Sequence, residues 1–165
     1  MLRWRKILCP VDFSEMSRKA MQVAAQIASD RDAELSLLHV YQAPGMSFPE
    51  ATFLAGDEVL QQIVKMVLQS LAEWGAEARR CGASQVTTHS AMGAPYAEIL
   101  RFAEQHKCDL IVMGTYGRTA LMRALLGSVA EKVVRHAPCP VLTVRPESVP
   151  AAVTEEVSSH EPAMH

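Results

Sequence analysis

The 165-residue chain carries 16 basic and 18 acidic side chains, a net charge of −2, and 49% of its residues are hydrophobic. These values are typical of one globular domain with a substantial core. Residues 1–146 carry 16 basic and 14 acidic side chains, and this balance does not indicate a protein built to coat nucleic acid. We therefore expect no nucleic-acid partner.

The cysteine pattern and the amino terminus point to the cytoplasm. Four cysteines are widely spaced and form no C-x-x-C pair, as in a protein that is kept reduced. The basic start M-L-R-W-R-K precedes an apolar run that is short and is followed by Asp12, so neither export nor membrane spanning is expected. The histidines are scattered without metal-ligand spacing, and we expect no structural metal.

Five short segments predict strands, and four longer ones predict helices. Residues 6–11 and 109–113 are continuous apolar runs, which are typical of strands buried on both faces of a parallel sheet. The other expected strands are 34–40, 85–91 and 141–144, and the expected helices are 15–29, 57–80, 95–106 and 128–136.

Two of the expected helices show a clear apolar stripe. In the first helix, four residues are expected to face the core: Ala20, Val23, Ala24 and Ile27. The second helix has the strongest pattern, with seven apolar residues at helical spacing: Val59, Leu60, Ile63, Val64, Val67, Leu68 and Leu71.

Strands that alternate with helices predict an α/β fold. Parallel neighbours need a crossover between them, so we expect a single doubly wound domain with a five-stranded, mainly parallel sheet and helices on both faces. This domain is expected to span residues 1–146. Residues 147–165 contain four glutamates and no lysine or arginine, which favours a solvated, disordered tail.

Ligands of open α/β sheets bind outside the carboxyl ends of the strands, near the point where the strand order reverses. The residues at those ends are therefore candidates for binding. They are Pro10, Val11 and Asp12 after the first strand, Val40 after the second, Met92 and Gly93 after the third, and Met113 and Gly114 after the fourth. Asp12 has an alternative role, because an acid at this position can simply cap the next helix.

The stretch from Gly114 to Ser128 has the spacing G-x2-G-x9-G-S between a buried strand and a helix. Glycines let the backbone approach a ligand closely, and the first amides of a helix attract anions. The pattern therefore predicts a phosphate site that uses Gly117, Gly127 and the Ser128 hydroxyl, with Arg118 adding a charge-assisted contact. Val129 completes the candidate set. The alternative is that these glycines only form a turn and begin a helix.

Other nucleotide and catalytic motifs are missing from the sequence. The first strand is not followed by G-x-G-x-x-G, which a dinucleotide site needs, and the chain has no Gly-Lys pair for a Walker loop. The G-x-S-x-G elbow of serine hydrolases is also missing. No general base accompanies the phosphate loop, so we expect binding with slow hydrolysis at most.

Residues 3–146 resemble the universal stress protein family in its ATP-binding branch. The resemblance rests on K-I-L-C-P-V-D-F-S, G-A-P, D-L-I-V-M-G-T-Y-G, the glycine-serine spacing and H-A-P-C-P-V-L-T-V-R. It implies the adenine nucleotide alpha-hydrolase-like fold and ATP as ligand. The phosphates would lie on Gly114, Gly117, Gly127 and Ser128; Asp12 would hold the ribose or a phosphate-bound Mg, and the Val40 backbone the adenine.

Since no general base is evident, our first hypothesis is a regulatory stress-response protein in which ATP stabilises one conformation that an unidentified protein partner recognises. Two alternatives stay open: a stress-related interaction protein that needs no nucleotide, and a slow ATPase. The strand over Val141–Val144 is expected at an edge of the sheet, where unpaired backbone must be covered. By the resemblance, the same strand of a second copy pairs with it antiparallel in a homodimer; the alternative is that the tail shields it.

Overall fold

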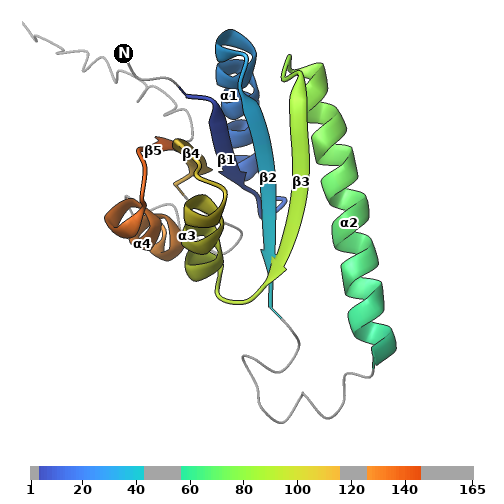
Figure 1. The fold of residues 1–165 in the computed structure, drawn as a ribbon. Helices are drawn as coiled ribbons and strands as arrows, with labels where there is room; N and C mark the ends of the chain where they lie inside the picture. Colours follow the sequence, from blue (N-terminus) through green and yellow to red (C-terminus); the bar gives the residue numbers. More distant parts are fainter. Residues whose placement is uncertain (1–3, 43–56, 116–125, 146–165) are drawn as a thin grey trace, which may run out of the picture.

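The computed structural model describes residues 4–42, 57–115 and 126–145. In these ranges, strands and helices alternate along the chain (Figure 1). In chain order they are β1 (Lys6–Pro10), α1 (Glu15–Arg31), β2 (Glu34–Tyr41), α2 (Asp57–Arg80), β3 (Gln85–Met92), α3 (Pro95–Gln105), β4 (Leu110–Gly114), α4 (Ser128–His136) and β5 (Val141–Val144).

The five strands form one sheet in the order β3-β2-β1-β4-β5, and every neighbouring pair is parallel. The predicted doubly wound α/β architecture is therefore confirmed. The chain first adds strands on one side of β1 and then returns to the other side, so the strand order reverses between β1 and β4. That reversal is the place where folds of this kind bind ligands.

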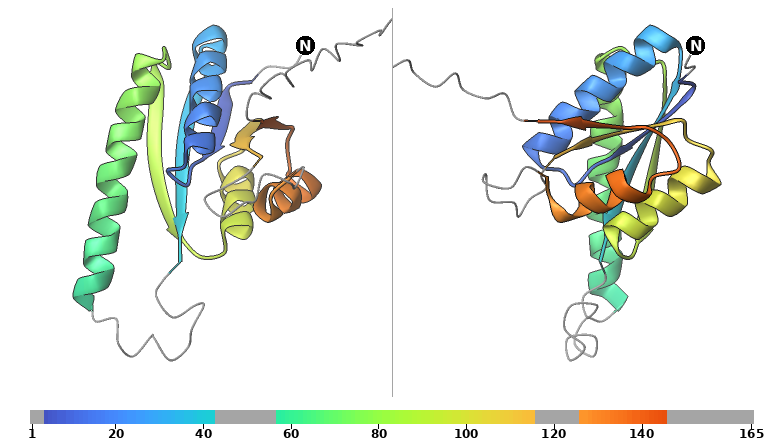
Figure 2. Two further views of the ribbon diagram at one scale, coloured as in Figure 1. Left: turned by 180° about the vertical axis from the view of Figure 1, so that it is seen from behind. Right: turned by 90° about the vertical axis from the view of Figure 1, so that its left-hand side faces the viewer.

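Helices cover both faces of the sheet (Figure 2). Side chains of β1 alternate between the faces: Ile7 and Cys9 pack in the core beneath α1 and α2, whereas Leu8 packs in the core beneath α3 and α4. This arrangement explains why the sequence of β1 is a continuous apolar run, because each of its faces is buried against a helical layer.

The buried stripe of α1 differs in part from the predicted one. Ala20 and Ala24 are buried as expected, but Val23 is exposed and Ile27 is only partly buried. The fully buried positions also include Met21, Ala25 and Ala28. The helix is rotated because its small alanines allow it to lie close to the sheet, and the bulkier Val23 is left outside.

The helix α2 packs on the sheet mainly through its carboxyl-terminal half. Val67 and Leu71 are buried, whereas Val59 and Leu68, which belong to the same predicted stripe, are exposed. Met66 is 68% exposed. The first turns of α2 extend past the ends of the strands (Figure 1), so the described sheet gives them nothing to pack against.

Predicted element boundaries agree with the structure within about two residues. The first strand ends at Pro10 instead of Val11, and the fourth spans Leu110–Gly114 instead of 109–113. The four cysteines are free thiols. Among the described residues, no helix has the length and apolar character needed to cross a membrane.

Candidate functional site

The turn between β1 and α1 carries the predicted residues Pro10, Val11 and Asp12. Ser14 is the N-cap of α1, and its hydroxyl accepts a hydrogen bond from the Ser17 amide at 3.2 Å. Asp12 does not take that capping position. Its Oδ1 accepts a hydrogen bond from the Ser14 amide at 3.0 Å, which orients the carboxyl group within the turn.

A buried histidine supports this turn from β2. Because a carbonyl can only accept, Nδ1 of His39 donates to the Val11 oxygen, at 2.7 Å. The His39 ring also stacks on Phe13, with ring centroids 4.3 Å apart. Phe13 has a φ of 62°, a left-handed conformation that is uncommon for a bulky residue. His39 therefore contacts the residues on both sides of Asp12, a role that the sequence analysis missed.

The end of β4 lies beside α1. Met113 is buried, and a Cβ atom added to Gly114 would lie 3.3 Å from the backbone carbon and oxygen of Met16. Backbone atoms of a helix have little room to move, so a glycine is required here by packing against α1. The glycine spacing predicts close approach of a ligand at this position, and packing against α1 is a second reason for the glycine.

Thr115 connects the end of β4 to β5 and to the start of α4. Its amide donates to the Val144 oxygen at 3.0 Å, and its own oxygen accepts from the Gly127 amide at 2.7 Å. Gly127 is the N-cap of α4, and no side chain caps this helix. The next two predicted residues open the helix: Ser128 is exposed and Val129 is partly buried.

The remaining predicted residues lie on β2 and β3. Val40 is partly buried on the α3 and α4 face. Gly93 has a φ of 152°, and its amide donates to the Tyr41 oxygen at 3.0 Å, so it forms the tight turn into α3. Met92 is 52% exposed and follows Ala91, which packs on the same face as Val40; by alternation, the Met92 side chain lies on the opposite face.

The structure brings together the candidates on three adjacent strands. Because β1 pairs with both β2 and β4, the carboxyl ends of these three strands are adjacent. Asp12, Val40 and Gly114 lie at or just after those ends. Met92 and Gly93 follow β3, which is two strands away from β1. Gly117 and Arg118 lie outside the described residues.

The described residues include no group of three or more histidine, cysteine, aspartate or glutamate side chains that could hold a metal ion. The residues at the carboxyl ends of the strands could therefore hold Mg only if phosphate were bound together with it. In that case Asp12 would supply a carboxylate oxygen, while phosphate and water would supply the other ligands, which is how proteins usually hold this ion.

The thiols of the described core are poor nucleophiles. Burial raises the pKa of the Cys108 thiol to about 11, and burial also raises the pKa values of Cys9 and Cys139. The thiolate is the reactive form of cysteine, so a raised pKa makes these three thiols weaker nucleophiles than an exposed cysteine.

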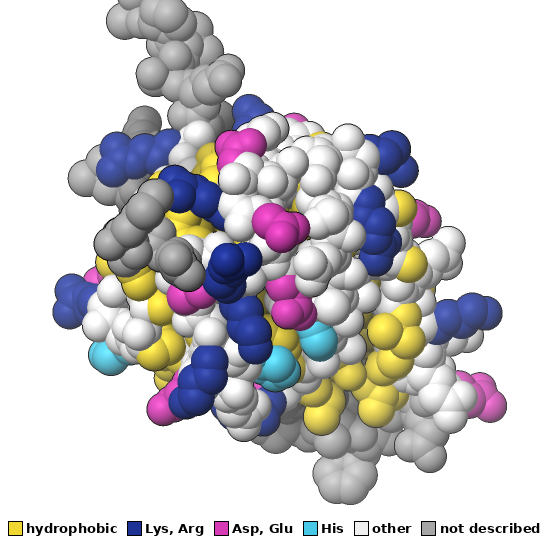
Figure 3. Space-filling view, turned by 45° about the horizontal axis from the view of Figure 1, so that its top comes forward, with side chains coloured by type: hydrophobic (Ala, Val, Ile, Leu, Met, Phe, Trp, Pro, Cys, Tyr) yellow, Lys and Arg dark blue, Asp and Glu magenta, His cyan; other side chains and the backbone are white. Residues whose placement is uncertain are grey.

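The opposite end of the molecule has a mixed charge distribution. Figure 3 brings forward the end where the strands begin, and basic and acidic side chains are interspersed over it. Histidines also lie at this end of the fold: His89 and His106 have ring centroids 5.8 Å apart. Burial and, next, His106 lower the pKa of His89, while Glu34 acts in the opposite direction.

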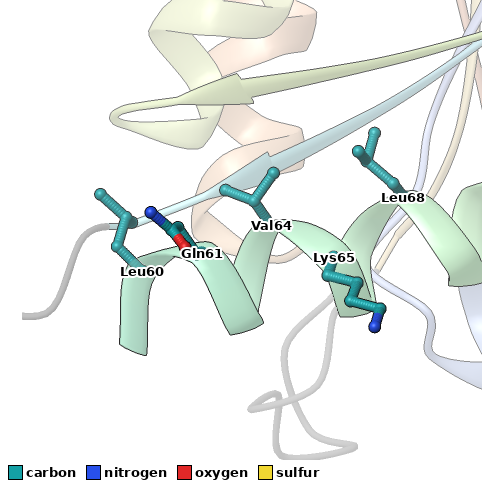
Figure 4. A pocket seen from close by; sticks show the side chains of 5 residues that line it. All are labelled: Leu60, Gln61, Val64, Lys65 and Leu68. Atoms are coloured by element: carbon teal, nitrogen blue, oxygen red, sulfur yellow. The ribbon is translucent and has the colours of Figure 1, made fainter. Parts of the chain in front are cut away.

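A shallow surface hollow lies along the first half of α2 (Figure 4). Leu60, Val64 and Leu68 project from one side of the helix into it, beside Gln61 and Lys65. The hollow is apolar and open, and none of the residues that line it belongs to the strand ends described above.

Comparison with known proteins identifies the family. The family model described as "Universal stress protein family" matches residues 3–145. The chain belongs to the universal stress protein family. Universal stress protein MJ0531 of Methanocaldococcus jannaschii is 40% identical over 148 residues, which cover 86% of this chain and 82% of that protein.

Two solved structures of universal stress proteins contain adenine nucleotides. One is in complex with cAMP: it is 27% identical, has a TM-score of 0.65, and the match covers 87% of this chain and 98% of that one. The other, from Archaeoglobus fulgidus, is in complex with dAMP, with 25% identity, a TM-score of 0.60 and coverage of 87% and 98%. The two ligands share an adenine base, a sugar and one phosphate.

Proposed function

We propose that this universal stress protein binds ATP at the carboxyl edge of its sheet, between the β1–α1 turn and the start of α4. The observation that carries the proposal is the uncapped amino terminus of α4, which lies at the same edge as Asp12. The unpaired amides of such a terminus form an anion site. The phosphates are assigned to Gly114, Gly127, Ser128 and Val129.

The base and sugar are assigned to the neighbouring strand ends. Val40 lies one strand from β1, and its position is suited to adenine, which the two nucleotide-bound relatives have in common. Asp12 is suited to the ribose hydroxyls or to a phosphate-bound Mg, because its carboxyl group is fixed by the Ser14 amide. We further propose a cytoplasmic regulatory role, in which a partner protein distinguishes the ATP-bound form.

Nucleotide content and affinity test this proposal. The purified protein is extracted with acid, and any released nucleotide is identified by chromatography. Titration calorimetry then compares ATP, AMP and adenosine on nucleotide-free protein. We expect ATP to bind more tightly than adenosine because of its phosphates. Absence of ATP binding at millimolar ligand would leave the interaction protein that needs no nucleotide as the better function.

We also propose that β5 pairs with β5 of a second copy in a homodimer. This strand forms one edge of the sheet, and Leu142 on it is 39% exposed. The oxygens of Pro140 and Val144 accept from β4, so the polar groups of even-numbered residues point toward β4. Those of Val141 and Thr143 therefore point to the open edge and are available to another strand.

Thr143→Pro tests the dimer without disturbing the sheet. Proline removes an outward amide that a second copy would use, whereas the hydrogen bonds to β4 come from neighbouring residues. Thr143→Val, which keeps the amide, is the matched control. Light scattering after size exclusion is expected to give a dimer for the wild type and the control and a monomer for the proline variant. A monomeric wild type at micromolar concentration would contradict the proposal.

A further inference from the structure

Thr115 carries a hydroxyl whose surroundings call for a ligand. The residue follows the last residue of β4 and has 0% of its surface exposed. Its Oγ1 has no hydrogen-bond partner, although its backbone amide and oxygen are both bonded. A buried hydroxyl without a partner is unfavourable, and such groups in native proteins commonly mark a place where a ligand or water binds.

The backbone pattern shows which face of the sheet the hydroxyl lies on. The Thr115 amide donates to the Val144 oxygen at 3.0 Å, just as the Ile111 amide donates to the Pro140 oxygen at 3.0 Å. Residues whose amides point to the same neighbouring strand are an even number apart and share a face. Ile111 and Met113 both pack in the core with α3 and α4, so the Thr115 side chain lies on the α4 side.

The same side holds the start of α4. The Gly127 amide donates to the Thr115 oxygen at 2.7 Å, which fixes the helix start against Thr115. The first hydrogen bond of the helix runs from the Glu131 amide to the Gly127 oxygen. The amides of residues 128–130 therefore have no partner within the helix, and Gly127 has no side chain to offer them. Two independent features, an uncapped helix start and an unpartnered buried hydroxyl, meet at one place.

We propose that Thr115 is a phosphate ligand, whose Oγ1 donates a hydrogen bond to a phosphate oxygen of the nucleotide at the amino terminus of α4. This inference rests on the proposed function. The position is one of the unspecified residues in G-x2-G, so the glycine-serine spacing gives it no role. Bound phosphate would supply the acceptor that the protein itself does not provide.

Thr115→Val tests the assignment through two effects of opposite sign. Valine has the shape of threonine without the hydroxyl, so the nucleotide-free protein should become more stable because a buried polar group without a partner has been removed. Affinity for ATP should fall by about tenfold or more, as expected when a charged acceptor loses a donor. Adenosine, which carries no phosphate, should bind the variant and the wild type equally. Thr115→Ser keeps the hydroxyl and should bind ATP within about threefold of the wild type.

The controls separate this inference from the proposed function. If the wild type binds no ATP, both are wrong. If the wild type binds ATP and Thr115→Val binds it equally well, only the phosphate-ligand role is wrong. An equal loss of adenosine and ATP affinity, or a Thr115→Val protein that is less stable than the wild type, also overturns it. Thr115→Cys, with a weak thiol donor, is a second variant for the binding comparison, and it should lose ATP affinity while adenosine affinity is kept.

Discussion

Two helices of this protein, α1 and α4, begin at the carboxyl ends of the strands. They differ in whether a side chain accepts hydrogen bonds from their first amides. The first helix, α1, is capped by Ser14, and Asp12 and His39 bond to the backbone of the turn that precedes it. In contrast, α4 begins at Gly127, which has no side chain, and it lies against a threonine hydroxyl without a partner.

The difference separates these two helix starts as candidate phosphate sites. The helix α3, which begins after β3, also has no side-chain cap, so it is the unpartnered Thr115 hydroxyl that distinguishes the start of α4. The dipole and the free amides are properties of any helix. A capping side chain accepts a hydrogen bond from one of those amides, as Ser14 does from the Ser17 amide, so an uncapped helix has one more amide to offer an anion. In the proposed function, the turn before α1 positions the Asp12 carboxylate, and the start of α4 supplies amide donors to phosphate. The following predictions test this division.

Loss of the hydrogen bond between His39 and the turn that precedes α1 should have the largest effect on stability. His39→Leu removes the donor to the Val11 oxygen and leaves that buried acceptor without a partner. We expect the free energy of unfolding to fall by about 1–3 kcal/mol, measured by urea denaturation. His136→Leu is the control, because its Nδ1 also bonds to a backbone oxygen but is exposed. An equally small effect at both positions would show that His39 does not hold the turn.

A cap added to α4 should weaken nucleotide binding. Gly127 has a φ of −71° and a ψ of 156°, which any residue can adopt, so Gly127→Asp is not strained by its backbone. The aspartate would cap the helix and repel phosphate, and we expect calorimetry to show about tenfold weaker binding of ATP. The protein should be as stable as the wild type or slightly more so. Gly127→Asn, an uncharged cap, should weaken binding less, and unchanged ATP affinity in Gly127→Asp would contradict the comparison.

Removal of the cap from α1 should affect stability instead. Ser14→Ala deletes the hydroxyl that accepts from the Ser17 amide, and we expect a loss of about 1 kcal/mol in the free energy of unfolding. Ser14→Asp keeps a capping oxygen and should restore most of that loss. If the alanine variant is as stable as the wild type, then the cap of α1 contributes nothing, and the contrast with α4 loses its basis.

The smallest expected effect lies far from both helix starts, at His89. Its pKa is below the ordinary value, so the folded state binds the proton less tightly than the unfolded state. Its contribution to stability is therefore constant above about pH 6.5 and declines as the pH falls below that value. Urea denaturation on both sides of this pH should show a smaller decline in His89→Gln than in the wild type. Equal declines would show that other groups cause the acid sensitivity.

Sequence periodicity predicted the fold because the strong signals are local. The continuous apolar run of β1 and the spacing in α2 depend on residues close together in the chain, and both elements were predicted within one residue at each end. The orientation of α1 was predicted less well, since it depends on how closely alanines approach the sheet. Val23 has a helical spacing typical of the core, yet it is exposed.

For the candidate site, the sequence singled out residues only where residue type and position together suggested a binding role, and that assignment stays a prediction. Asp12 and the glycine-serine spacing stood out because they follow buried strands at the place where α/β sheets bind ligands, although capping, turn formation and packing against α1 can also explain them. Thr115 and His39 did not stand out. The Thr115 backbone is bonded to β5 and to the start of α4, and the stacking of His39 on Phe13 joins β2 to the turn between β1 and α1. Such relations become visible only when distant segments are placed together.

The central place of β1 has a consequence for synthesis on the ribosome. This strand emerges before both of its neighbours, and one of them, β4, follows about 100 residues later. At about 5–20 residues per second, one edge of an apolar strand is left open for roughly 5–20 seconds. During that interval the backbone of β1 on this side has no strand to pair with, whereas the helix α1, which is made before β4, can already cover one face of the strand.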